Sequence, residues 1–224
     1  MKKILRKIKR LFDRLIGDYS DELFWKYGIY FLNNWKQGYL DDECINRPHR
    51  NIFIGLMLND KNITKILELG CGDGVNLRRI AKKNPNIQLE GIDINKRALH
   101  QGMSILKNSN TNIKLTRKNL KDLSTFNDGE FDVIFSDATL MYIDPSNIYH
   151  VINNSIRVCK MKFFLCEQHT DGNSFYDDKW IHNYKLILQK NSAVESIKIH
   201  NISGSGWSGD WAKYGKIIEV VKQI

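Results

Sequence analysis

From residue 64 onward, short apolar segments of strand length alternate with segments of helical length. This alternation is typical of a parallel, doubly wound α/β sheet. The expected strands are 64–69, 87–93, 112–117, 131–137 and 161–168, and the expected helices are 75–83, 95–107, 146–159 and 178–190. Two more strands, 194–200 and 216–222, follow without a helix between them, so we expect them to pair antiparallel. The sequence therefore predicts a seven-stranded, mostly parallel sheet with an antiparallel C-terminal hairpin strand.

The chain before residue 64 has a different pattern, which predicts a helical appendage to this domain. A basic amphipathic helix is expected at 1–17, followed by a helical and aromatic cap at 18–60 and the α/β domain at 61–224. A helix expected at 48–59 leads into the first strand. With 224 residues the chain suits one domain with a sizeable core.

The first strand ends in the turn LELGCGDG, which is built for close approach of a ligand to the backbone. Its three glycines are Gly70, Gly72 and Gly74. Glycine allows positive φ, and ligands of open α/β sheets bind beyond the carboxyl ends of the strands. A dinucleotide fingerprint would need glycine at position 75, where this chain has Val75. The carboxylates of Glu68 and Asp73 would repel a pyrophosphate, so we expect a ligand that carries positive charge.

S-adenosylmethionine carries such charge on its sulfonium and amino groups. Asp93 closes the second strand in EGIDIN, where an acid can accept hydrogen bonds from both ribose hydroxyls. Asn119 follows the third strand and is placed to present its amide near an adenine edge. These positions predict an S-adenosylmethionine site.

The motifs ILELGCGDGVNL, GIDINKRAL and FDVIFSDATL together resemble the class I, Rossmann-like S-adenosylmethionine-dependent methyltransferases, with surface-glycan biosynthesis as the suggested subgroup. The resemblance runs from about residue 50 to the C-terminus. It implies cofactor contacts by Glu68, Gly70, Gly72, Asp73, Asp93, Ile94, Asn119 and Leu120. The family more often has Asp where this chain has Asn119. The resemblance also places Asp137 beside the methionine moiety and the substrate, and it places the last strand antiparallel between its neighbours.

Methyl transfer requires in-line alignment of a nucleophile, and an oxygen nucleophile must also lose a proton. The fifth strand ends in CEQHTDG, which offers Glu167 and His169 as candidate bases beside Asp137. The alternative for His169 is a polar loop residue. Cysteine and histidine spacing predicts no metal site.

Nucleic acid is not the expected acceptor. Amino-group methylases of nucleic-acid bases typically have an Asn/Asp-Pro-Pro-aromatic motif where this chain reads SDAT at 136–139. The net charge is +9, of which residues 1–14 hold seven basic residues and one acid, so the remaining 210 residues carry 9 − 6 = +3. A nucleic-acid-binding domain would spread its charge over the fold.

Two aromatic groups are candidate substrate contacts. The loop SGSGWSGDW at 203–211 contains Trp207 and Trp211, either as parts of a mobile lid or as residues that fill the gap under a long hairpin. Tyr142, after the fourth strand, is a third candidate. In NRPHRN, Arg47 and Arg50 are expected on a solvated face, with contact to a carboxylate or phosphate as the alternative.

In the N-terminal segment MKKILRKIKRLFDRLIG the apolar residues form one helical stripe and the other face is almost wholly Lys and Arg. Such a helix at 2–16 is typical of an anionic membrane interface, although packing on the domain or on a partner subunit is the alternative. No apolar run approaches the ~18 residues of a membrane span. The four cysteines lack disulfide or metal spacing, which indicates a cytoplasmic protein.

The sequence thus predicts a methyltransferase at the cytoplasmic membrane face that acts on a small polar acceptor, most simply a hydroxyl of a glycan or lipid-linked sugar. The alternatives are an O-methyltransferase of a lipid or other small metabolite, and a protein methylase. A non-catalytic module that binds S-adenosylmethionine and is recruited to the membrane is an alternative of another class. The sequence does not identify the acceptor or the oligomeric state.

Overall fold

The computed structural model describes residues 17, 19–27, 48–107, 109–177, 179–201 and 207–223. Within them, a mixed sheet of seven strands runs in the order β3-β2-β1-β4-β5-β9-β8. Its strands are β1 (Lys65–Leu69), β2 (Gln88–Asp93), β3 (Ile113–Arg117), β4 (Phe131–Asp137), β5 (Cys159–Gln168), β8 (Val194–His200) and β9 (Gly215–Lys222). This arrangement confirms the predicted fold class, and each strand lies within two residues of its predicted bounds.

The strand directions show which strands have their carboxyl ends at the same edge of the sheet as the glycine turn. Strands β3, β2, β1, β4 and β5 pair parallel, whereas β9 pairs antiparallel with both β5 and β8. Strand β8 therefore runs in the same direction as β5, and its carboxyl end lies on the same edge as the glycine turn. The prediction that the last strand lies antiparallel between its neighbours is confirmed.

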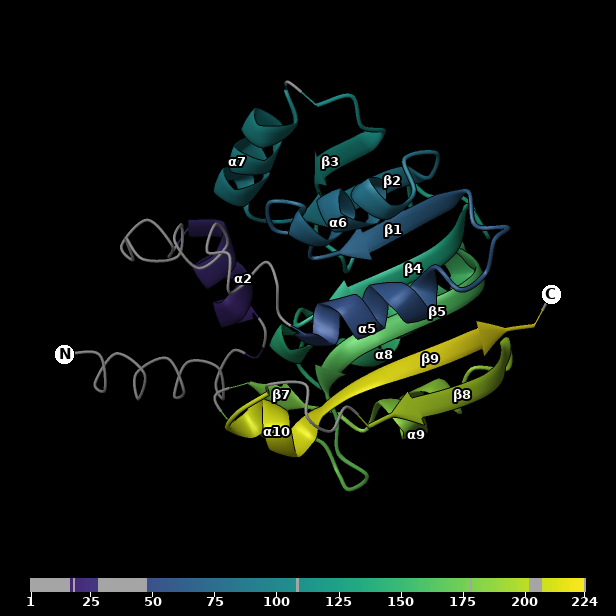
Figure 1. Cartoon of the computed structure of the whole chain (residues 1–224). Coiled ribbons are helices and arrows are strands. Elements are labelled where there is room, and N and C mark those ends of the chain that lie inside the picture. The colour runs from purple at the N-terminus through teal and green to yellow at the C-terminus, as the bar shows by residue number, and fades with distance from the viewer. Residues whose placement is uncertain are drawn as a thin grey trace.

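Helices cover both faces of the sheet, and each face has its own core (Figure 1). One face carries α5 (Pro48–Met57), α6 (Val75–Lys83) and α7 (Lys96–Leu106), whose apolar residues pack in a cluster that includes Phe53, Leu77 and Leu99. The other face carries α8 (Ile148–Val158) and α9 (Tyr184–Leu188), which pack in a second cluster with Ile152 and Tyr184. The alternation of β-strand side chains between these two clusters decides which polar residues meet at the carboxyl edge.

The helix predicted at 178–190 is wrong in its first half. The structure has the short hairpin strands β6 (Phe175–Tyr176) and β7 (Trp180–Ile181) before α9. The Asn183 side chain accepts a hydrogen bond from the Leu186 amide and so caps the N-terminus of α9. The helix therefore begins only at Tyr184. The apolar residues at 180, 181, 184 and 188 have helical spacing, but the first two are used in strand pairing.

Little of the N-terminal segment is described. The helix α2 (Tyr19–Tyr27) lies near the 3₁₀ turn η2 (Leu140–Tyr142), because Trp25 and Tyr142 make an edge-on ring contact with centroids 5.1 Å apart. Glu22 also pairs with Lys121 at 3.2 Å. The predicted membrane helix at 2–16 lies outside the described residues. Among the residues that are described, no helix has the length and apolarity needed to cross a membrane.

Candidate cofactor and acceptor site

The glycine turn after β1 is held against the end of β2. Gly70, Gly72 and Gly74 have φ values of 70°, 55° and 77°, in the left-handed region that glycine allows. The amides of Gly70 and Cys71 both donate to the Ile92 carbonyl, at 2.8 and 3.0 Å. The turn therefore presents its outer surface at the carboxyl edge of the sheet.

Asp93 lies directly beneath this turn. Its Oδ2 accepts from the Gly72 amide at 2.7 Å, and its Oδ1 accepts from the Asn95 amide at 2.7 Å. Burial raises the pKa of the Asp93 carboxyl, while these backbone N–H groups lower it in part. Each oxygen accepts one of these bonds and retains acceptor capacity. The geometry fits the ribose-binding role predicted for Asp93.

Three buried polar side chains connect β1, α6 and β4 on the other side of the turn. Asn76 donates through Nδ2 to Glu68 Oε1 at 2.8 Å and to Asp137 Oδ2 at 3.1 Å. Burial raises the pKa of Glu68 well above its usual value, and the nearby Asp137 charge raises it further. Glu68 Oε2 is buried and has no hydrogen-bond partner. A cationic group of a ligand would relieve the cost of burying the Glu68 carboxylate.

Arg50 supplies positive charge to this cluster from the first turn of α5. Its Nε lies 3.2 Å from Asp137 Oδ2, and His49 Nε2 lies 3.8 Å from Asp137 Oδ1. Burial raises the pKa of the Asp137 carboxyl, but His49 and Arg50 more than offset it, so the pKa is well below its usual range. The prediction of a solvated face is wrong for Arg50, which is only 7% exposed. Arg47 lies outside the described residues.

The sequence held one signal for this contact. A helix that feeds directly into β1 runs opposite to the strand, so its first turn lies at the strand's carboxyl edge. The basic residues His49 and Arg50 stand in that first turn and therefore reach the site.

The same cluster brings together three donor types of metal ligands. His49, Asp137 and Cys166 place one nitrogen, one carboxylate oxygen and one sulfur within 4.8 Å of one another. Burial raises the pKa of the Cys166 thiol well above its usual value, and Arg50 already neutralises Asp137. Both conditions oppose a bound cation, so we assign no metal to this group.

The remaining predicted cofactor residues differ in where their polar groups point. Asp73 is fully buried, and its Oδ2 pairs with Arg78 at 3.3 Å. The Asn119 carbonyl oxygen of the side chain accepts from the Lys121 amide at 3.0 Å, which leaves its NH₂ group as the end available to adenine. Ile94 accepts from Arg117 through its backbone carbonyl at 3.3 Å. Leu120 packs against the α8-side core.

The turn after β4 is strained and closely packed. Ala138 has φ 58°, a value that is uncommon for a residue with a Cβ. Thr139 follows and donates through Oγ1 to the Gly70 carbonyl at 3.3 Å. A strained residue beside the glycine turn, at the end of β4, is a feature typical of functional sites.

Glu167 and His169, the candidate bases, both face the α8 side of the sheet. Glu167 Oε1 accepts from the amides of Thr139 and Leu140, each at 2.9 Å. His169 Nδ1 accepts from the Tyr184 amide at 3.3 Å, so Nε2 carries the proton that Asp171 accepts at 3.3 Å. Burial lowers the pKa of His169. Both ring nitrogens are engaged, and a base at this position would first have to release one partner.

The aromatic candidates form two separate groups. Trp207 and Trp211 have ring centroids 5.3 Å apart, and Trp207 lies 5.2 Å from the His49 ring. Both tryptophans pack on the core cluster of the α5 face. Tyr142 instead contacts Trp25, with the Lys179 ammonium 6.0 Å from its ring centroid. Residues 202–206 of the tryptophan loop lie outside the described residues.

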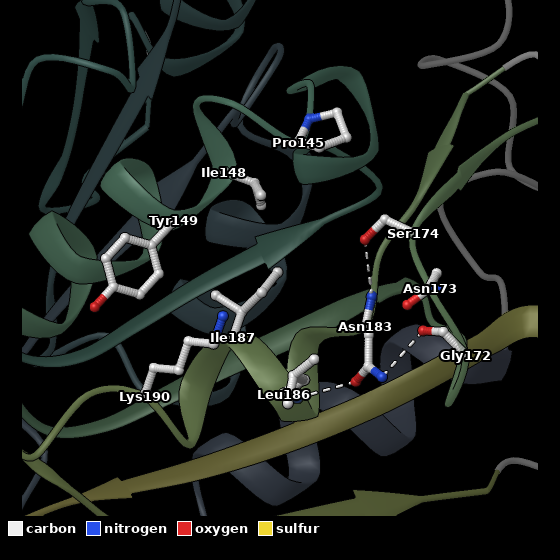
Figure 2. A pocket seen from close by; sticks show the side chains of 10 residues that line it. All are labelled: Pro145, Ile148, Tyr149, Gly172, Asn173, Ser174, Asn183, Leu186, Ile187 and Lys190. Atoms are coloured by element: carbon white, nitrogen blue, oxygen red, sulfur yellow. Dashed lines mark hydrogen bonds between the residues drawn. The ribbon is translucent and has the colours of Figure 1, made fainter.

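A cavity of about 240 Å³ lies elsewhere on the carboxyl edge, between the start of α8, the segment before β6, and α9 (Figure 2). Its wall combines Ile148, Ile187 and the exposed side chains of Tyr149 and Leu186. Asn183 lies at its rim, but the side-chain NH₂ group of Asn183 donates to the carbonyls of Asp171 and Gly172. None of the predicted site residues lines this cavity.

Comparisons with known proteins agree with this fold. Residues 66–162 match a family described as "Methyltransferase domain". A curated relative, malonyl-[acyl-carrier protein] O-methyltransferase 1 of Ilyobacter polytropus, is 33% identical over 80 residues, which are 35% of this chain and 28% of the relative. The chain thus matches little more than a quarter of that relative's length.

Solved structures show the same architecture. Magnesium protoporphyrin IX methyltransferase of Synechocystis PCC 6803, with bound SAM, superposes with a TM-score of 0.65 at 14% identity, over 92% of this chain and 97% of that one. Phosphoethanolamine N-methyltransferase 2 of Haemonchus contortus, in complex with S-adenosyl-L-methionine, superposes with a TM-score of 0.70 at 14% identity. The superposition covers 89% of this chain and 60% of that one.

Residues 66–162 thus match a methyltransferase-domain family, and the strand order and glycine turn form the class I, Rossmann-like fold that the sequence motifs predicted.

Proposed function

We propose that this chain is an S-adenosylmethionine-dependent methyltransferase that acts on a small polar acceptor. The observation that carries the proposal is the pair of hydrogen bonds that fix the Asp93 carboxylate beneath the glycine turn, 2.7 Å from the Gly72 amide. The buried Glu68 on the other side of the turn, whose Oε2 has no hydrogen-bond partner, supports a ligand with cationic groups. In this proposal the ribose lies at Asp93 and the methionyl half of the cofactor lies toward β4.

A hydroxyl of a glycan or lipid-linked sugar at the cytoplasmic membrane face is the acceptor that the sequence favours. The support for this choice is the basic amphipathic helix that the sequence predicts at 2–16 and the aromatic residues near the site. Removing residues 1–17 tests the membrane part: the truncated protein should lose sedimentation with anionic liposomes. Equal sedimentation of both proteins would contradict it.

A carboxylate acceptor is a second candidate, favoured by the state of His169. A carboxylate is already ionised at neutral pH and needs no base, whereas both ring nitrogens of His169 have partners. The relative from Ilyobacter polytropus is by name an O-methyltransferase of a malonyl-acyl-carrier protein, and a malonyl group ends in a carboxylate. Lipid and other small-molecule acceptors, protein acceptors and a non-catalytic binding module are the remaining alternatives.

Calorimetric titration with S-adenosylhomocysteine tests the cofactor assignment. The wild-type protein should bind it, and Asp93→Asn should weaken binding by about 10-fold or more because the amide cannot accept hydrogen bonds at both positions. Asp171→Asn is the matched control, since the Asp171 side chain is 89% exposed. A folded wild-type protein that does not bind would overturn the assignment.

A screen with labelled methyl donor then separates the acceptors. Sugar hydroxyls, malonyl thioesters and free fatty acids are the first three classes to compare. Binding of S-adenosylhomocysteine without turnover toward any acceptor would favour the non-catalytic module.

A further inference from the structure

Glu167 is the second-last residue of β5, and its side chain is fully buried. One of its carboxylate oxygens, Oε1, accepts from two consecutive backbone amides, those of Thr139 and Leu140, both at 2.9 Å. Hydrogen bonds to a carboxylate are stronger than those between neutral groups. Glu167 therefore ties the end of β5 to the turn that follows β4.

This turn requires such support because its first residue is strained. Ala138 has φ 58°, and its amide donates to the Cys166 carbonyl of β5 at 3.0 Å. Strained residues persist only where the surrounding structure holds them. Two neighbouring residues of β5, through one carbonyl and one carboxylate, thus fix three consecutive amides of the turn, those of residues 138–140.

The turn that follows β4 packs directly against the glycine turn. Thr139 lies over Gly70 so closely that a Cβ on Gly70 would be 2.2 Å from Thr139 Cγ2. Thr139 Oγ1 also donates to the Gly70 carbonyl at 3.3 Å. Glu167 is thereby linked to the glycine turn through one intervening residue.

The strand order shows which part of a bound cofactor this contact would reach. In the proposed function the ribose lies at Asp93 on β2, so the cofactor beyond its sulfur extends over β1 toward β4. The acceptor then lies over β4 and β5. Thr139 stands between these two places.

We propose that Glu167 is a positioning residue that holds Thr139 and Leu140 as the wall for the methionyl half of the cofactor. The inference rests on the proposed function, because it takes S-adenosylmethionine as the ligand. It replaces the predicted role of Glu167 as a base: Oε1 is committed to the backbone, and Oε2 is buried away from solvent.

Two ligands that differ only in the methionyl half test this role. S-adenosylhomocysteine has the amino-acid chain, whereas 5′-methylthioadenosine has the same adenosine and sulfur without it. We expect Glu167→Ala to raise the Kd of S-adenosylhomocysteine about 10-fold and to change the Kd of methylthioadenosine less than about 3-fold. Glu167→Gln should restore both affinities, because its amide oxygen can accept the same two N–H groups.

Each outcome has a definite meaning. An equal loss for both ligands, or no loss for either, would overturn the positioning role while leaving the proposed cofactor intact. Absence of binding by the wild-type protein would instead overturn the proposed function. If Glu167→Ala does not fold, Glu167→Asp takes its place: it keeps the charge but shortens the reach, and it should show the same selective loss.

Discussion

Arg50 and Asp137 form a buried ion pair, with Nε and Oδ2 3.2 Å apart, that joins the first turn of α5 to the end of β4. The two residues are 87 positions apart in the chain. Their contact ties the segment before the α/β domain to the strand end beside which the methyl donor is proposed to lie.

Replacement of Arg50 should be costly because it would leave the Asp137 carboxylate buried with less compensating charge. We expect Arg50→Gln to lower the free energy of unfolding by about 3 kcal/mol, as measured by urea denaturation. Lys83→Gln, on the exposed end of α6, is the control and should change it by less than about 0.5 kcal/mol. Equal stability of the two variants would show that the ion pair contributes little.

Protonation of Glu167 should make stability depend on pH near neutrality. Burial raises the pKa of this carboxyl to about 7, although the Leu140 and Thr139 amides lower it in part. Because the folded pKa is raised, the stabilisation is complete below the usual value of 4.5 and is lost as the pH rises through about 7.

We expect the wild-type protein to gain on the order of 2 kcal/mol between pH 7.5 and pH 5, relative to Glu167→Gln, which cannot titrate. Thermal unfolding of both proteins across this range measures the difference. The comparison cancels the contribution of Glu68, whose pKa is raised in the same direction. Parallel pH profiles of the two proteins would contradict the raised pKa.

Gly70→Ala should lower the free energy of unfolding by more than the positive φ at this position alone would cause. The Cβ of alanine would collide with the Thr139 side chain at 2.2 Å, and φ is 70°. Gly129→Ala is the matched control, because φ there is 62° and the nearest atoms lie at an ordinary 3.9 Å. We expect a loss of about 1 kcal/mol at Gly129 and about 2 kcal/mol more at Gly70. Similar losses would mean that Thr139 moves away at little cost.

Trp207→Ala separates the two interpretations of the tryptophan loop. Trp207 packs on the α5-face core and on His49, so its removal should lower the free energy of unfolding by about 2 kcal/mol. Chemical denaturation measures this loss. Unchanged stability combined with altered ligand exchange would favour a mobile lid.

The glycine turn and the antiparallel direction of the last strand could be predicted because each depends on local pattern, whereas the place of that strand between its neighbours came from the family resemblance. Positive φ at Gly70, Gly72 and Gly74 follows from residue type and spacing, and the antiparallel β9 follows from the missing helix before it. The pairing of Arg50 with Asp137 could not be read this way, since side-chain partners across 87 residues leave no local pattern.

The hydrogen bonding of Glu167 could not be predicted for another reason. A carboxylate at a strand end reads equally well as a base or as an acceptor of backbone hydrogen bonds. Only the positions of the Thr139 and Leu140 amides distinguish the two. The error at 178–190 is similar, because apolar spacing alone does not separate a short hairpin from a helical turn.

The antiparallel direction of β9 has a practical consequence for work with this protein. Because β9 begins at Gly215 beside the end of β5, residue Lys222 lies at the opposite edge of the sheet from the glycine turn (Figure 1). A fluorophore or an immobilising tag joined after β9 would therefore leave the ligand-binding edge facing solution.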